Sequence, residues 1–273
     1  MHGPEMHQPA SGPGLGPGAG WLWLLAGTGD GPPLAAALLQ QGWSLQVSVV
    51  SEAAARAYRP HPRLRLATGP LAGPAAIAAE LQRRAYAAVV DATHPFAVRI
   101  SADLAAACRS RGQHLLRLHR EVPAGPGVTL LAGLEELGQR PLVGQRLLLA
   151  IGMRQLGAAV ALSPGALHHA RLLPTAASLQ AAQAAGLPAE RVACVRPSRS
   201  GWIEAALLRH WDITTVLARQ GGGASEAVWQ RLCRERGLSL LLIQRPAAVA
   251  LPLDQLLQQL AALARNPQLP WPP

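Results

Sequence analysis

Lysine is absent from this chain of 273 residues, and all 25 residues counted as lysine or arginine are arginine. The absence excludes catalysis through a lysine Schiff base and the phosphate loop of P-loop nucleotidases, which needs a lysine. Short-chain and nucleotide-sugar dehydrogenases of Rossmann type are excluded as well. Their Tyr-x-x-x-Lys pair needs a lysine near one of the two tyrosines, Tyr58 and Tyr86.

Cysteine is scarce, and long apolar runs are missing. Cys108, Cys194 and Cys233 are widely spaced and form no paired metal-ligand pattern, so we expect reduced thiols and no metal site. No apolar run reaches the roughly 18–20 residues of a membrane helix. No arginine precedes Arg56, which leaves no positively charged start of a secretory signal. We therefore expect a cytoplasmic protein with no membrane partner.

Acidic residues are few, and the 15 aspartates and glutamates leave a formal net charge of +10. A strongly basic protein attracts polyanions, either nucleic acid or a small molecule that carries many carboxylates. The arginines are spread along the chain, and the aromatic share of 4% is too low for base-stacking platforms. We therefore expect no nucleic-acid partner, although a merely solvated arginine surface stays open as an alternative.

Short apolar runs that alternate with helix-period segments are abundant. This alternation predicts an α/β fold with parallel, doubly wound sheets. We expect two Rossmann-like lobes with a cleft between them. The expected divisions are a disordered leader (1–20), an N-terminal dinucleotide-binding lobe (21–121), a linker region (122–145), a C-terminal α/β lobe (146–265) and a disordered tail (266–273).

The first predicted strand, Trp21 to Ala26, runs directly into Gly27-Thr28-Gly29-Asp30-Gly31 and a helix over Leu34 to Gln41. A strand, a glycine turn and a helix together direct backbone N–H groups at a phosphate. The spacing is G-x-G-x-G rather than the standard dinucleotide fingerprint, so a tight turn with Asp30 as helix cap stays open.

The end of the second strand normally decides between NAD and NADP. Ser48, Ser51 and Arg56 are candidates to accept the 2′-phosphate of NADP, whereas Glu52 is a candidate for the ribose hydroxyl of NAD. The residues alone leave this choice open.

A second polar strand end follows the apolar run Ala87 to Val90, where Asp91, Thr93 and His94 precede a helix-period segment over Val98 to Cys108. Ligands of open α/β sheets bind beyond the carboxyl ends of the strands, so these residues are candidates for a site. The alternative is that Asp91 or Thr93 only caps the helix.

Arginines recur at the predicted strand-to-helix junctions of the second lobe. They are Arg154, Arg196, Arg199 and Arg219. Because guanidinium groups bind carboxylates through two parallel hydrogen bonds, these junctions predict binding of a polycarboxylate.

The segment Asp91-Ala92-Thr93-His94-Pro95-Phe96-Ala97, followed by Ile100-Ser101 and the Ala105 to Cys108 run, resembles the signature of the precorrin-6A reductase family. That family uses NADPH to reduce a double bond in a corrin precursor during cobalamin biosynthesis. The resemblance covers roughly residues 21–250. It implies NADPH as cofactor, a polyanionic tetrapyrrole as substrate and other corrin-pathway enzymes as partners, and it leaves open whether the substrate contains cobalt.

The chain departs from the family's pattern at several positions. Ala26 stands where the family commonly has glycine, and Asp103 where it often has asparagine. Arg196-Pro197-Ser198 replaces a glycine-proline-phenylalanine corner, and Arg219 before Gln220-Gly221-Gly222 replaces a lysine before a serine-glycine-glycine loop. Arginine keeps the charge of lysine but not its geometry.

The expected site has three groups of residues. The catalytic residues are His94, Asp91 and Thr93, with His94 as the candidate proton donor because histidine titrates near neutral pH, and with substrate or solvent as alternative donors. The cofactor-binding residues are Gly27, Thr28, Gly29, Asp30, Gly31, Ser51, Thr93 and Pro95. The substrate-binding residues are Phe96, Arg154, Arg196, Ser198, Arg199, Arg219, Gln220, Gly221 and Gly222. A non-catalytic sensor of the same fold that binds NADP(H) is the main alternative, ahead of a basic nucleic-acid-binding protein.

Overall fold

The structure is a computed structural model that describes residues 20–26, 29–120 and 125–266. The chain divides into two compact units. The first unit contains Met1–Ala92, Ala102–Leu116 and Asp254–Pro273, and the second contains Thr93–Ser101 and Arg117–Leu253. Most of the expected leader and tail, together with Gly27 and Thr28, lies outside the described residues.

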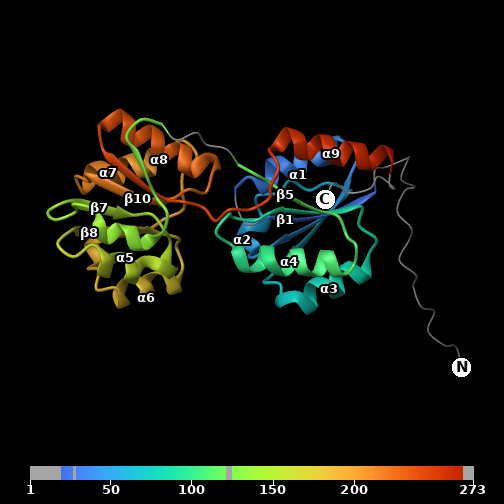
Figure 1. Cartoon of the computed structure of the whole chain (residues 1–273), viewed down its shortest axis with the longest axis horizontal. Coiled ribbons are helices and arrows are strands. Elements are labelled where there is room, and N and C mark those ends of the chain that lie inside the picture. Colours follow the sequence, from blue (N-terminus) through green and yellow to red (C-terminus); the bar gives the residue numbers. More distant parts are fainter. Residues whose placement is uncertain (1–19, 27–28, 121–124, 267–273) are drawn as a thin grey trace, which may run out of the picture. The chain divides into compact units, whose positions relative to one another are not determined.

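The first unit holds a five-stranded sheet with the order β3-β2-β1-β4-β5. Its strands are β1 (Trp21–Ala26), β2 (Ser44–Val49), β3 (Leu64–Thr68), β4 (Ala88–Ala92) and β5 (Leu115–Arg117). Its helices are α1 (Gly31–Gln40), α2 (Glu52–Ala55), α3 (Gly73–Arg83), α4 (Val98–Ser110) and α9 (Leu253–Arg265). Helices α1 and α9 lie on one side of the sheet and α3 and α4 on the other (Figure 1). Because the strand order reverses between β1 and β4, their carboxyl ends flank the position where such sheets bind ligands.

The second unit holds a six-stranded parallel sheet with the order β6-β11-β10-β7-β8-β9. Its strands are β6 (Val128–Leu131), β7 (Arg146–Leu149), β8 (Leu167–Leu172), β9 (Val192–Cys194), β10 (Thr215–Arg219) and β11 (Ser239–Ile243). Its helices are α5 (Leu156–Leu162), α6 (Ala176–Ala184), α7 (Trp202–His210) and α8 (Gly223–Arg236), with 3₁₀ turns η1 (Leu134–Gln139), η2 (Met153–Gln155) and η3 (Ala189–Arg191). The strand order reverses here between β7 and β10.

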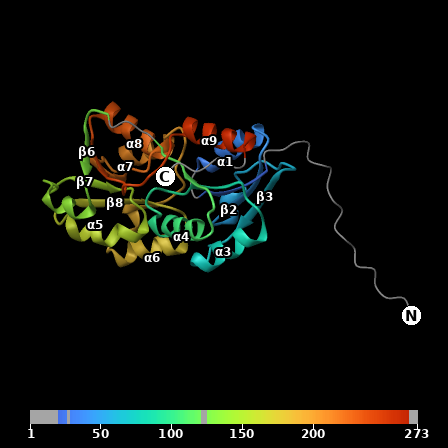
Figure 2. The same cartoon turned by 45° about the vertical axis from the view of Figure 1, so that its right-hand side comes forward.

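Successive residues of the central strands are buried on opposite faces of this second sheet. Leu147 and Leu149 belong to one core cluster, whereas Leu148 between them belongs to the other. Helices α5 and α6 cover one face, and α7 and α8 cover the other (Figures 1 and 2). Continuous apolar strands buried on both faces are typical of parallel sheets. The predicted α/β class with two parallel sheets is confirmed.

Two segments differ from the expected divisions. The region 122–145, expected as a linker, contains β6, which pairs with β11, and η1. Helix α9 was expected in the C-terminal lobe, but its residues from Asp254 onward group with the first unit. In both cases the element associates with segments that are distant in the sequence. The apolar pattern of a short strand or helix does not indicate which segments those are. Within the described ranges, no helix is both long and apolar enough to cross a bilayer.

Candidate active site

Two described glycines in the loop after β1, Gly29 and Gly31, differ in their surroundings. A Cβ added to Gly31 would lie against the Tyr58 hydroxyl and, at 2.6 Å, against the Ala26 Cβ, so glycine lets α1 approach β1 closely. A Cβ added to Gly29 would meet nothing within 4 Å, which leaves room in front of the backbone. Close helix-strand packing and an open approach to the backbone are two roles of glycine in dinucleotide loops.

The first turn of α1 offers few N–H donors for a phosphate. Pro32 and Pro33 have no N–H, and the Leu34 N–H donates to the Asp30 carbonyl at 3.2 Å. The helix therefore offers at most the Gly31 N–H. The Asp30 side chain accepts no capping hydrogen bond from α1, so the cap alternative has no support.

At the carboxyl end of β2, hydrogen bonds and exposure distinguish the residues that are candidates to select NAD or NADP. The Ser48 hydroxyl accepts a hydrogen bond from the Trp23 indole at 2.9 Å, and Glu52 accepts one from the Thr68 hydroxyl at 2.6 Å. Ser51 caps α2 by accepting the Ala54 N–H at 3.3 Å. Ser51 and Arg56 are both exposed, and they are the polar groups at this strand end that best fit a 2′-phosphate.

Tyr58, which lies behind the glycine loop, carries a buried hydroxyl without a hydrogen-bond partner among the described residues. Burial raises its pKa to about 12. We expect Tyr58→Phe to leave the free energy of unfolding unchanged or to raise it by up to about 1 kcal/mol, because the variant removes an unsatisfied polar group. Tyr86→Phe is the matched control. The Tyr86 hydroxyl donates to Glu80, so its loss should cost about 1 kcal/mol in urea unfolding. A larger loss for Tyr58→Phe than for Tyr86→Phe would contradict this expectation.

The polar segment after β4 forms a turn that leads into α4. Asp91 is 2% exposed at the end of β4. His94 closes the turn: its carbonyl accepts the Ala97 N–H at 2.8 Å, and its Nδ1 accepts the Phe96 N–H at 3.3 Å. The Thr93 hydroxyl contacts that of Ser101 at 3.3 Å.

The imidazole of His94 lies over the loop between β10 and α8. A Cβ added to Gly221 would lie 2.9 Å from His94 Nε2, so glycine lets the ring approach. Because Nδ1 accepts the Phe96 N–H, a neutral ring carries its proton on Nε2. Nε2 is therefore the ring nitrogen that has a proton to donate.

Two arginines and an aromatic ring meet where the strand order of the second sheet reverses. Arg219 donates to Gln155 Oε1 at 2.8 Å, and its guanidinium lies 5.1 Å from the centroid of the Phe96 ring. Burial, and then the positive charge of Arg154, lowers the pKa of Arg219. An anion bound beside these two guanidiniums would relieve their repulsion. The structure thus brings His94, Phe96, Arg154, Arg219 and Gly221 together.

A buried carboxylate holds the glycine loop in place. Glu226 is 3% exposed; it accepts the Gly222 N–H at 2.7 Å and the Gln230 side-chain amide at 2.9 Å. Burial raises the pKa of Glu226, and these hydrogen bonds oppose that shift. The loop therefore has a fixed shape at the carboxyl end of β10.

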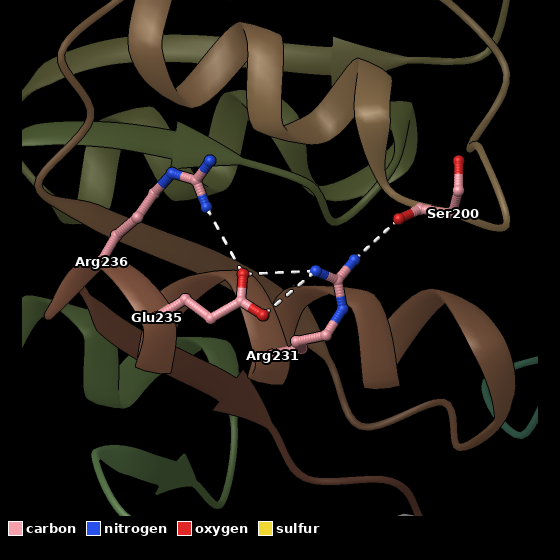
Figure 3. Close-up of polar contacts among 4 residues, drawn as sticks. All are labelled: Ser200, Arg231, Glu235 and Arg236. Carbon is pink, nitrogen blue, oxygen red and sulfur yellow. Dashed lines mark hydrogen bonds and ion pairs between the residues drawn. The ribbon is translucent and has the colours of Figure 1, made fainter.

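The corner after β9 is held by separate contacts. Ser198 donates its hydroxyl to Glu204 at 2.7 Å and its N–H to the same carboxylate at 3.2 Å. Arg231 on α8 donates to the Ser200 carbonyl at 2.7 Å and pairs with Glu235 (Figure 3). Arg196 and Arg199 are exposed. They follow the edge strand β9, with β7 and β8 lying between it and β10, whereas Arg154 and Arg219 follow adjacent strands.

Several further polar residues of the second unit lie at strand ends or loops that the sequence patterns do not single out. They are Arg117, His119, Arg120, Gln155, Glu226 and Arg245. Gln155 and Arg245 stand directly at strand-to-helix junctions or strand ends, the signal that was used for Arg154 and Arg219. Arg120 acts through a contact between distant segments, for which the sequence has no local signal, whereas Glu226 contacts Gly222 and Gln230, each four positions away.

A family model, curated relatives and a solved structure each match most of this chain. The family model described as precorrin-6x reductase CbiJ/CobK matches residues 21–265. A cobalt-precorrin-6A reductase from Synechocystis sp. is 32% identical over 234 residues, which cover 84% of this chain and 89% of the relative. A precorrin-6A reductase from Rhodobacter capsulatus is 33% identical over 239 residues, with the same two coverages. A solved structure named CobK precorrin-6A reductase aligns over 89% of this chain and 96% of its own, with a TM-score of 0.71 and 30% identity.

Proposed function

The chain belongs to the precorrin-6x reductase family, and on that premise we propose that it reduces a double bond of precorrin-6A, or of its cobalt form, in cobalamin biosynthesis. The observation that carries the substrate class is the meeting of Arg154, Arg219 and the Phe96 ring at one sheet edge. Paired guanidiniums suit carboxylates, and an aromatic face suits a flat macrocycle. Among the described residues these three groups therefore fit a tetrapyrrole with carboxylate arms.

The first unit is the proposed cofactor site, and NADPH is the proposed cofactor. Bound NADPH supplies a hydride for one carbon of the double bond. The loop of Gly27, Thr28, Gly29, Asp30 and Gly31 would bind the pyrophosphate. The open space at Gly29 and the close packing at Gly31 support this assignment. The exposed Ser51 and Arg56 would bind the 2′-phosphate, and Thr93 and Pro95 would contact the nicotinamide.

The second unit is the proposed substrate site. Arg154 and Arg219 would bind carboxylate arms, and Phe96 would lie against the ring. Gln220, Gly221 and Gly222 would shape the loop beside it. Arg196 and Arg199, which are exposed beside Ser198, would bind further arms. The three cysteines are free, which supports a reducing cytoplasmic location, and we propose the enzymes that supply and consume the macrocycle as partners.

His94 is the proposed donor of the proton that the neighbouring carbon takes up, with Asp91 and Thr93 as supporting catalytic residues. A proton leaves Nε2 readily only when both ring nitrogens are protonated. In that state Nδ1 no longer accepts the Phe96 N–H, so this hydrogen bond is broken. We expect His94→Ala to lower kcat by roughly 100-fold, the usual scale of general acid catalysis, while the Kd of NADPH stays unchanged. Single-turnover reduction with bound substrate is the measurement. Near wild-type turnover would assign the proton to substrate or solvent.

The proposal is tested by anaerobic NADPH oxidation with precorrin-6A, and separately with its cobalt form, beside NADH. Turnover with one macrocycle confirms the reductase and identifies the metal state and the cofactor. If NADPH binds but neither macrocycle is reduced, the chain is a nucleotide-binding sensor or has another acceptor. If neither nucleotide binds, the glycine loop is only a turn and the proposal fails.

A further inference from the structure

Helix α8 contacts two loops of the second unit that carry arginines. Near the start of the helix, Glu226 accepts the N–H of Gly222, which lies in the loop after Arg219. Arg231 lies five positions further along the helix and donates from Nη2 to the Ser200 carbonyl at 2.7 Å. Five residues of α-helix span about 7–8 Å. One rigid helix therefore anchors both the loop after β10 and the corner after β9, residues 196–201.

The contact between Arg231 and the corner is close and oriented (Figure 3). A Cβ added to Gly201 would lie 2.8 Å from Arg231 Nη2 and 2.8 Å from Val228 Cγ1, so glycine lets the guanidinium lie against the corner backbone. Nη1 of the same guanidinium donates to both carboxylate oxygens of Glu235, at 3.3 and 3.2 Å. Glu235 thus orients the guanidinium, and Nη2 is left to bind the Ser200 carbonyl.

The inner side of the corner is also fixed. Glu204 is 1% exposed and accepts both the hydroxyl and the N–H of Ser198. The Gly201 N–H donates to the Ser198 carbonyl at 3.2 Å. Arg196 and Arg199 are exposed in the same short segment. Ordering a surface loop on both sides costs conformational entropy, and such support is what a binding loop needs to present its charges at fixed positions.

We propose that Arg231 is a positioning residue whose hydrogen bond to Ser200 sets where the corner presents its two exposed arginines to carboxylate arms of the substrate. The inference rests on the proposed function, which supplies the polycarboxylate. The effect of Arg231 on binding passes through the corner backbone and not through a contact with the ligand. Losing this residue should therefore weaken binding of a polycarboxylate tetrapyrrole without slowing the chemical step.

The test uses the full-length protein and two variants that disturb the corner differently. Arg231→Ala removes the hydrogen bond to Ser200 together with one positive charge. Gly201→Ala keeps every charge but places a methyl group where the Arg231 guanidinium and Val228 now lie. A role in positioning predicts that both variants bind the ligand more weakly, whereas direct binding of the ligand by Arg231 predicts a loss only in the first.

Each variant has a matched control. Arg236 lies on the same helix and pairs with the same carboxylate of Glu235, at 3.8 Å, so Arg236→Ala makes the same change in net charge. Gly237 has a φ of +65°, and a Cβ there would meet nothing within 4 Å. Gly237→Ala therefore controls for the cost of a side chain on a left-handed backbone.

Three measurements are made on each variant. Binding of uroporphyrin, a stable polycarboxylate tetrapyrrole, is followed by fluorescence titration, and the Kd of NADPH is titrated separately. The KM and kcat for precorrin-6A come from the turnover assay. Amide hydrogen exchange of Ser198 and Gly201 in the ligand-free protein reports whether the corner has loosened.

We expect Arg231→Ala and Gly201→Ala to bind uroporphyrin roughly 3- to 10-fold more weakly, the scale of one hydrogen bond. The KM for precorrin-6A should rise by a similar factor, while kcat and the Kd of NADPH stay at the wild-type values. Exchange of the Ser198 and Gly201 amides should be faster in Arg231→Ala. Both controls should keep the wild-type values throughout.

Four results would overturn the proposal. Wild-type uroporphyrin binding by Arg231→Ala is the first, and an equal loss in Arg236→Ala, which would assign the effect to net charge, is the second. An equal loss of NADPH binding is the third. The fourth is weaker binding by Arg231→Ala with unchanged amide exchange or with wild-type binding by Gly201→Ala, because Arg231 would then contact the ligand itself. If Gly201→Ala does not fold, the amide exchange of Arg231→Ala decides this last point.

The two proposals fail in distinguishable ways. If the wild-type protein does not reduce precorrin-6A but Arg231→Ala loosens the corner and weakens uroporphyrin binding, the proposed function fails and the positioning role stands. If the protein reduces precorrin-6A and Arg231→Ala keeps the wild-type KM, the positioning role fails and the function stands.

Discussion

Replacing Glu204 with alanine is expected to lower the free energy of unfolding by about 3–5 kcal/mol, the cost of removing a buried charge from its partners. Glu204 is 1% exposed and accepts both the hydroxyl and the N–H of Ser198. Its charge also raises the pKa of Arg171, which burial lowers. Without the carboxylate, the Ser198 donors lose their acceptor, and the buried guanidinium of Arg171, which is 8% exposed, loses its compensating charge.

Two further variants separate the causes of this loss. Glu204→Gln keeps an acceptor for Ser198 but removes the charge, so it should cost less than the alanine variant. Glu235→Ala removes an exposed carboxylate that pairs with Arg231 and Arg236 (Figure 3). Exposed ion pairs contribute about 0–1 kcal/mol. Urea unfolding of the variants gives the comparison, and a loss for Glu204→Ala no larger than that for Glu235→Ala would contradict the buried role.

The proximity of Arg154 to Arg219 shows how much of a site can be predicted from the strand ends in a sequence. Each arginine stands just beyond or at the end of a short apolar run, and the carboxyl ends of parallel strands lie along one edge of a sheet. Those two facts were enough to expect neighbouring arginines. They did not indicate which of the four junctions would be adjacent, because this depends on strand order. Only β7 and β10 are neighbours, whereas the Arg196 corner follows the edge strand.

The contacts that fix the site were not predictable from local patterns. Arg120 donates to the Thr93 carbonyl at 3.0 Å, and its own backbone lies against Gly222. The two contacts join segments 27 and 102 positions away in the chain. Hydrophobic periodicity describes only which face of an element is buried. It identifies β10 and α8 as elements, but it does not identify what approaches the loop between them.

Gly222→Ala is expected to lower the free energy of unfolding by about 2–4 kcal/mol, from overpacking together with the cost of a backbone conformation, φ +66° and ψ 174°, that is essentially restricted to glycine. Gly222 has a φ of +66°, and an added Cβ would lie against the Arg120 Cβ and 2.7 Å from the Arg120 carbonyl oxygen. Gly237→Ala is the control at the other end of α8. Its φ is +65°, and a Cβ there would meet nothing within 4 Å, so it should cost only about 1 kcal/mol. Equal losses in urea unfolding would show that neither the Arg120 contact nor the backbone conformation of Gly222 costs more than the left-handed backbone of Gly237.

The same replacement should affect activity beyond its effect on stability. The Arg120 carbonyl accepts from Arg245, and the Arg120 guanidinium donates to the Thr93 carbonyl. Displacing Arg120 would therefore move both Arg245 and the turn that carries His94 and Phe96. We expect Gly222→Ala to lower kcat/KM for the macrocycle at a temperature where the variant is still folded. The Kd of NADPH should change less than kcat/KM, because the glycine loop proposed to bind the pyrophosphate belongs to the first unit, and only Thr93 and Pro95 of the proposed cofactor contacts lie in the turn. Gly237→Ala should change neither quantity, since its open surroundings connect it to none of these groups.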